Sequence, residues 1–124
     1  SQEFDGLIRE ALAFENDFTL MPTIDDQTLV LGLLTTWFPD IVVIEYPAFD
    51  AKVLTKSIRE VLPSCAIVVT LHSKRIKGKE YFGFFTAGVT HTISITPTSY
   101  QGNIIDGIRY AYHKARLSRS YEID

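Results

Sequence analysis

The chain has 124 residues, the size of one domain that can build a hydrophobic core without disulfides or structural metals. Its formal net charge of -3 gives no electrostatic basis for binding nucleic acid, and a single cysteine, Cys65, excludes an internal disulfide. Because we find no signal peptide and no apolar run long enough to cross a bilayer, we expect a cytoplasmic protein without membrane contact.

Helix and strand patterns alternate from the start of the chain. Apolar residues recur at helical spacing over residues 1–12, and residues 18–21 then predict a short strand. A second helix follows, with Asp25 or Asp26 as its N-cap, and Pro39 marks its end.

Two strongly apolar strands are predicted in the middle of the chain. Residues 39–46 contain a run of β-branched residues without alternation, which is typical of a strand buried on both faces of a parallel sheet. Residues 66–71 are apolar apart from Thr70, and they predict a second strand of this kind. Between the two, Asp50 is the expected N-cap of a helix that Pro63 closes.

The last third continues the alternation. Residues 72–79 are rich in cations, which disfavour the positive end of a helix dipole, so we expect a loop there. A helix over 80–86, a strand over 91–95 and a final helix over 99–117 follow. Residues 118–124 are predicted to form a polar tail or the start of a linker.

Together these elements predict an α/β fold with one domain over residues 1–117. Strands separated by helices imply right-handed crossovers and a parallel sheet that carries helices on both faces. We expect four strands within the chain.

Six segments, in the right order and at nearly the right spacing, resemble the receiver domain of response regulators. They are residues 39–45, 47–51, 58–63, 67–71, 87–88 and 108–109. The resemblance covers the chain from Phe4 to about Leu117 and implies a CheY-like, flavodoxin-like three-layer α/β/α sandwich. Receiver domains begin with a central apolar strand that is apparently missing here. Whether that strand is truncated, exchanged with a second copy or absent stays open.

The residues that would perform the family's aspartyl phosphotransfer depart from its pattern. The acceptor aspartate of receivers matches Glu45, whose extra methylene moves the nucleophilic oxygen by about 1 Å, enough to lose much of the benefit of positioning. The acidic pair that holds magnesium in the family matches Glu3 and Phe4, which leaves at most one carboxylate for the metal.

The remaining family positions also lack their chemistry. The switch threonine or serine matches Thr70 or, without a shift of one, Leu71, and the aromatic switch position matches Thr92. The lysine that pairs with the phosphoryl group matches Ile95 or Thr96, and neither carries a charge. We therefore expect a pseudo-receiver that is not an enzyme and holds no metal or cofactor.

Aromatic residues predict an interaction surface on the helix over 80–86. Four rings cannot all be buried on one helix face, so Phe82 and Phe85 are assigned to the core, and Tyr81 or Phe84 is left for a partner. In receivers the fourth helix, fifth strand and fifth helix form a common dimer surface. The resemblance therefore implies a homodimer or a protein partner at this surface.

The cations Lys74, Arg75 and Lys77 are a second candidate contact, with an acidic partner or a phosphate, although a solvated loop has the same composition. DNA would be bound only by a domain outside this chain.

Three functions stay open. The first is a phosphorylation-independent signalling module that acts by protein–protein interaction, as the N-terminal part of a response regulator or transcription regulator. The second is an unusual receiver that accepts phosphate on Glu45. The third is a small flavodoxin-like enzyme or ligand-binding domain that uses the strand-end residues Glu45, Thr70, His72 and Ser94.

Overall fold

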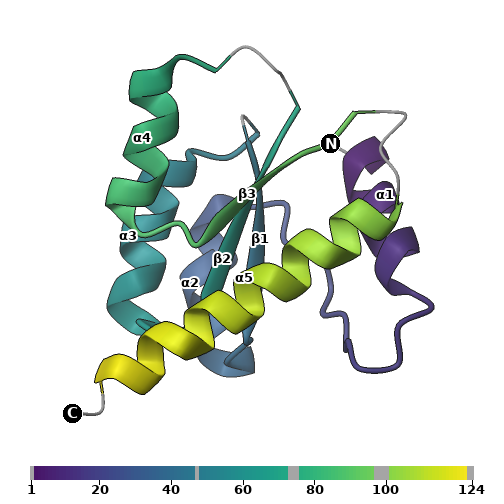
Figure 1. Ribbon diagram of the computed structural model, residues 1–124, viewed down its shortest axis with the longest axis horizontal. Coiled ribbons are helices and arrows are strands. Elements are labelled where there is room, and N and C mark those ends of the chain that lie inside the picture. Colours follow the sequence, from purple (N-terminus) through teal and green to yellow (C-terminus); the bar gives the residue numbers. More distant parts are fainter. Residues whose placement is uncertain (1, 47, 73–75, 97–100, 123–124) are drawn as a thin grey trace.

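A computed structural model describes residues 2–46, 48–72, 76–96 and 101–122 (Figure 1). Its elements, in chain order, are α1 (Gln2–Leu12), the 3-10 helix η1 (Gln27–Leu29), α2 (Val30–Trp37), β1 (Ile41–Tyr46), α3 (Ala51–Val61), β2 (Ala66–Leu71), α4 (Gly78–Ala87), β3 (His91–Ser94) and α5 (Gln101–Glu122).

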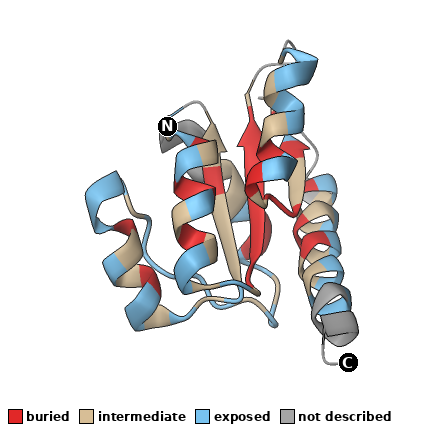
Figure 2. Cartoon of the chain, turned by 90° about the vertical axis from the view of Figure 1, so that its left-hand side faces the viewer, coloured by how far each residue is buried: buried red, intermediate tan, exposed pale blue. Residues whose placement is uncertain are grey.

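The three strands form a parallel sheet in the order β1-β2-β3. The central strand, β2, is buried along its whole length, which explains its unbroken apolar sequence (Figure 2). Successive side chains of β2 point to opposite faces, so Ala66 and Val68 join one core cluster, while Ile67 and Val69 join the other.

Helices cover both faces of this sheet. Apolar residues of α1 and α5, among them Leu12 and Ile108, pack on one face. Residues of α2, α3 and α4, among them Leu34, Ile58 and Phe84, pack on the other. This confirms the predicted flavodoxin-like three-layer α/β/α arrangement. Among the residues that the structure describes, no helix has the length and apolarity that a membrane span requires.

The strand predicted over residues 18–21 is wrong, because this segment makes no ladder with the sheet. Leu20 and Met21 are exposed, and the segment is held by side chains: the Arg9 guanidinium donates to the Met21 carbonyl over 2.6 Å and to the Thr23 hydroxyl. A strand needs a neighbour to satisfy its backbone, and a short apolar pattern does not supply one. The described part of the chain therefore has three strands, where four were expected.

The position of β1 also differs from expectation. The strand itself is confirmed, but it lies at an edge of the sheet, and of its residues only Ile44 is buried. Its other side chains are half-buried, because one long edge of the strand has no neighbouring strand among the described residues. The continuous apolar run of β1 was predicted to form a strand buried on both faces, but it forms an edge strand.

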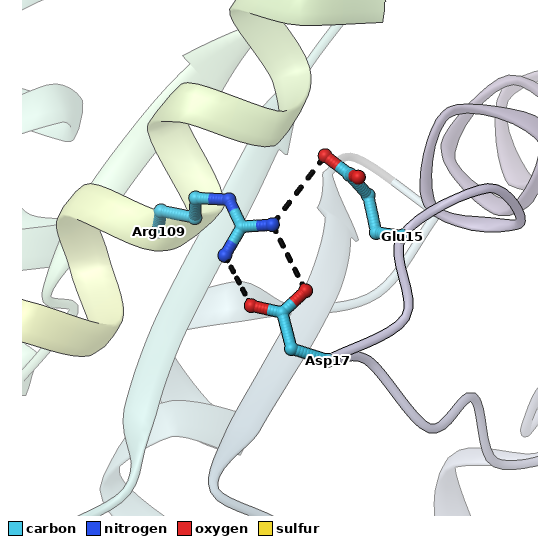
Figure 3. A network of polar contacts seen from close by, with 3 residues as sticks. All are labelled: Glu15, Asp17 and Arg109. Atoms are coloured by element: carbon cyan, nitrogen blue, oxygen red, sulfur yellow. Dashed lines mark hydrogen bonds and ion pairs between the residues drawn. The ribbon is translucent and has the colours of Figure 1, made fainter.

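A bidentate ion pair fixes the coil after α1 to α5 (Figure 3). The Arg109 guanidinium on α5 donates to both carboxylate oxygens of Asp17, over 2.5 and 2.9 Å, and lies 3.4 Å from the Glu15 carboxylate. Its Cζ also lies 4.9 Å from the centre of the Phe18 ring. The ion pair lowers the pKa of Asp17 below its usual value and raises that of Arg109. These contacts hold the segment in the absence of strand pairing.

Helix boundaries follow the expected caps with two extensions. Asp26 caps η1 through the Thr28 N–H, and Asp50 caps α3 through the Val53 N–H. Helix α4 begins at Gly78, two residues before the predicted start. Helix α5 continues to Glu122, beyond the expected end near Leu117 and into the stretch assigned to a polar tail. That stretch contains no glycine or proline to stop a helix.

Candidate functional site

The candidate site lies at the carboxyl ends of the three strands, where ligands bind in open α/β sheets. The strand register sets Glu45 beside Thr70, and Thr70 beside Ile93. Residues opposite one another in parallel strands point to the same face. Ile93 belongs to the core cluster of α1 and α5, so this row projects toward that layer.

Glu45 forms the central contact of the site with His72, which follows β2 directly. The His72 Nδ1 and Glu45 Oε1 atoms are 3.5 Å apart, and the two side chains are 14% and 19% exposed. Burial lowers the pKa of His72 below its ordinary value, and the Glu45 carboxylate opposes this only in part. The lowered pKa favours a neutral imidazole beside Glu45 at neutral pH.

The register separates the two candidates for the switch position. Thr70 is 1% exposed and neighbours Glu45 in the sheet, whereas Leu71 neighbours Tyr46 and packs in the opposite core cluster. The Thr70 hydroxyl donates to the Ile44 carbonyl over 3.5 Å. Thr70 is thus the residue beside the Glu45 carboxylate, but its hydroxyl is engaged with the backbone.

The two residues aligned with the family lysine lie just after β3. Ile95 is fully buried in the α1 and α5 cluster, and its N–H donates to the Leu71 carbonyl over 2.8 Å. Thr96 is half-buried. An isoleucine enclosed in the core provides packing and no counter-charge at this end of the sheet.

Four predicted site residues lie wholly or partly outside the described residues. The backbone of Glu3 and Phe4 belongs to α1, but their side chains are not described. Lys74 and Arg75 are outside the described residues altogether. In the part of the chain that is described, no three His, Cys, Asp or Glu side chains gather in a way that could hold a metal ion.

The assignment of the aromatic residues on α4 is corrected. Phe84 is fully buried and makes an edge-to-face contact with Tyr46, with ring centroids 5.1 Å apart, so it belongs to the core. Phe82, which was assigned to the core, is 74% exposed, and Phe85 is 37% exposed. Periodicity identified an aromatic helix but not its rotation about its own axis.

A hydrogen bond joins β1 to α4 beside this contact. The Tyr46 hydroxyl donates to the Glu80 carboxylate, and this bond, together with burial, raises the pKa of Tyr46 above its ordinary value. The start of α4 is therefore anchored to the end of β1, next to the Glu45–His72 pair.

Exposed rings flank the edge strand β3. Tyr81 and Phe85 of α4 contact each other with centroids 5.2 Å apart, and the Thr92 hydroxyl lies 3.4 Å from the Tyr81 hydroxyl. On the α5 side, His91 contacts Tyr110, with ring centroids 4.9 Å apart. The predicted residues Tyr81 and Thr92 therefore lie together on the face formed by α4, β3 and α5, which we call the α4–β3–α5 face.

Sequence reasoning missed one surface feature, a groove between α3 and α4. Its lining includes Lys52 and Lys56 of α3, together with Phe82 of α4. The groove could have been predicted from two small residues on α4, Gly78 and Gly83. Glycines on a helix leave room for long side chains from a neighbouring helix.

The strand-end site brings a carboxylate within 3.5 Å of an imidazole. Among the candidate residues described there, Thr70 is the hydroxyl beside this pair in the sheet, and it is buried and turned to a carbonyl.

Comparisons with known proteins give a likeness in structure alone. No protein-family model matches the chain, and no curated protein does either. Among solved structures, NtrX from Brucella abortus, crystallised in complex with ADP, matches with a TM-score of 0.80 and 16% identity. The match covers 98% of this chain and 26% of the NtrX chain, so the chain spans about a quarter of that protein.

A second match is the signal receiver domain of the putative response regulator NarL from Mycobacterium tuberculosis. It has a TM-score of 0.71 and 16% identity, over 90% of this chain and 88% of that domain. At this identity the likeness concerns the arrangement of the backbone. The chain therefore has the CheY-like, flavodoxin-like α/β fold that is seen in response-regulator receiver domains.

Proposed function

We propose that the chain is a receiver-like regulatory module that acts through protein–protein contacts and without phosphorylation at the strand ends. The main support for this proposal is the identity of the residues at the carboxyl ends of the strands. Glu45 occupies the position that the resemblance gives to the acceptor, and the position of the lysine falls on the fully buried Ile95 or on Thr96, neither of which is charged.

The balance of charge supports this proposal. A phosphoryl group would bring about two negative charges to a site that already contains a carboxylate, and it would need a cation nearby. His72 lies within 3.5 Å of Glu45, but its lowered pKa keeps it neutral at pH 7. Neither Ile95 nor Thr96 carries a charge at any pH of interest.

The switch positions support it as well. A movement of Thr70 toward a phosphoryl group would break its bond to the Ile44 carbonyl in a fully packed environment. At the aromatic switch position, Thr92 has no ring to rotate and contacts Tyr81 instead. We therefore propose that regulation does not use the threonine–aromatic relay of the family.

The α4–β3–α5 face is the proposed contact surface, for a second copy or for another protein. Tyr81 and Phe85 expose rings beside the edge strand, and Tyr110 of α5 is 54% exposed. Exposed aromatic residues on either side of a short edge strand are typical of protein interfaces. Any contact with DNA is assigned to a domain outside this chain.

The phosphorylation half of the proposal is tested by mass spectrometry. The chain and its Glu45→Asp variant are incubated with acetyl phosphate and magnesium, with an ordinary receiver domain as positive control. We expect no phosphoryl group on either protein, because neither Ile95 nor Thr96 supplies a counter-charge and the Glu45→Asp change does not add one. A phosphorylated wild-type chain contradicts the proposal. Phosphorylation of the aspartate variant alone would show that the counter-charge argument is wrong.

The contact half is tested by sedimentation velocity across a concentration series. Tyr81→Glu introduces a charge on the proposed face, and Phe14→Glu introduces the same charge at a residue that is 85% exposed elsewhere. We expect self-association that Tyr81→Glu weakens by about tenfold or more, which corresponds to about 1.4 kcal/mol, while Phe14→Glu leaves it unchanged. Equal effects of both variants contradict the assignment of this face.

A further inference from the structure

A groove with a volume of about 570 Å³ runs between α3 and α4, which lie side by side (Figure 1). From α3 it is lined by Lys52 and Lys56, and from α4 by Gly78, Lys79, Phe82, Gly83, Thr86 and Ala87. The groove belongs neither to the strand-end site nor to the α4–β3–α5 face.

Three lysines line this groove. Lys52 and Lys56 are one helical turn apart on α3, and Lys79 lies on the opposite wall. Of the ion pairs found in the described residues, none involves these three lysines. Like charges at this spacing repel each other. The groove is thus a locally positive region on a chain whose formal net charge is -3.

Phe82 adds an apolar ring to the charged walls. It is 74% exposed, whereas Phe84 on the same helix is fully buried and supplies the aromatic contact to the core. Packing within the domain therefore gives no reason for a phenyl ring at position 82. A solvated aromatic residue rimmed by cations is a common feature of surfaces that bind another protein.

Small residues form the floor of the groove and set its shape. A Cβ atom at Gly83 would lie 3.1 Å from Cδ and 3.2 Å from Nζ of Lys52. The glycine thus gives the Lys52 side chain room to lie against α4, with its ammonium group inside the groove. Ala87, one turn further along α4, is similarly short and is itself buried.

We propose that this groove binds an acidic segment of another protein. Carboxylates of that segment pair with the ammonium groups of Lys52, Lys56 and Lys79, and an apolar side chain between them packs on Phe82. Nucleic acid fits less well, because the net charge of the domain is negative and one ring offers no stacking platform for successive bases.

The test uses the isotope-labelled chain and a synthetic peptide of about 12 residues that repeats Glu-Glu-Leu. We expect amide shifts confined to α3 and α4 around residues 52–56 and 78–87. A matched peptide with serine in place of leucine separates the apolar contact from the charge contact, and we expect it to bind about three- to tenfold more weakly.

Substitutions in the groove show which side chains contribute to the affinity for the peptide. Lys52→Gln combined with Lys56→Gln is expected to weaken peptide binding by about tenfold, and Phe82→Ala by about threefold or more. The matched controls are Lys114→Gln on α5 and Phe14→Ala at another exposed ring, and both are expected to bind as the wild type does. Heat denaturation of each variant shows that the fold is intact.

Three results would overturn the inference: amide shifts that map to another face, control variants that weaken binding as much as the groove variants, or a single-stranded oligonucleotide that binds the groove more tightly than the peptide. None of these measurements involves phosphorylation or self-association. The inference can therefore fail while the proposed function holds, and the reverse is equally possible.

Discussion

The two ends of the sheet are built in different ways. At the amino end the Arg59 guanidinium donates to the carbonyl oxygens of Gly88, Pro63 and Cys65 and to the Thr90 hydroxyl. The Thr90 hydroxyl in turn accepts from the N–H of residue 67. At the carboxyl end, the Glu45 carboxylate lies 3.5 Å from the imidazole of His72, whose pKa burial lowers, and the fully buried Ile95 follows β3.

This difference separates the hydrogen bonds that hold α3 and α4 to the sheet from the residues of the strand-end site. At the amino end, Arg59 connects α3, the end of α4 and the start of the sheet. These connections, which we call the frame, do not depend on charges in the strand-end pocket. Substitution of the pocket residues therefore leaves the hydrogen bonds of the frame in place. Substitutions at three positions test how each region contributes to stability.

The largest effect is expected from Arg59→Ala. The variant leaves several half-buried carbonyl groups without their charged donor, and we expect unfolding to become easier by about 2–4 kcal/mol in urea denaturation. The stability of Arg59→Lys is expected to lie between those of the wild type and Arg59→Ala, because one ammonium group cannot replace the several planar donors of a guanidinium group. The exposed Arg116→Ala serves as control. A change below about 0.5 kcal/mol for Arg59→Ala would show that the amino end is held by packing alone.

A smaller, pH-dependent effect is expected from His72→Asn at the carboxyl end. The pKa of His72 is lowered in the folded chain, so below an ordinary pKa of about 6.5 the unfolded chain binds more protons than the folded one. The contribution of neutral His72 to stability is thus complete above that pH and is lost as the pH falls through the folded pKa.

Denaturation midpoints measured between pH 7.5 and pH 5 give the slope of stability against pH. We expect the variant to lose part of it and to retain the part due to His91, whose pKa burial also lowers. His113, an exposed histidine, is the matched control in a His113→Asn variant. An unchanged slope in His72→Asn contradicts the assignment of a neutral, buried imidazole beside Glu45.

The smallest effect is expected from Arg109→Gln, which removes the ion pair shown in Figure 3. Because the carboxylate of Asp17 is exposed, water and salt weaken the pair, and global stability should fall only slightly. The local effect should be clearer: hydrogen exchange is expected to quicken in residues 13–26, which have no strand pairing.

A double-mutant cycle with Asp17→Asn isolates the pair in that experiment. The coupling should decline when salt is raised to about 1 M, where the screening length is about 3 Å. Additive effects of the two variants would show that the coil is held by the packing of Phe18 and not by the ion pair.

The sequence alone determined the elements whose signals are local. Uninterrupted apolar runs marked β1 and β2, and capping side chains marked the starts of η1 and α3 at Asp26 and Asp50. The order of these elements was sufficient to predict the layered α/β fold. The position of Glu45 at a strand end followed from the same pattern, because a strand's end is fixed by its own residues.

The contacts between these elements were not predictable from local patterns. The edge position of β1, the missing ladder at residues 18–21 and the burial of Phe84 in place of Phe82 depend on neighbours that are distant in sequence. The same is true of the contact between Glu45 of β1 and His72, the residue that follows β2. The sequence pattern shows which residues are apolar. Which face of a helix is buried, and which strand pairs with which, depend on the free energy of packing the whole chain.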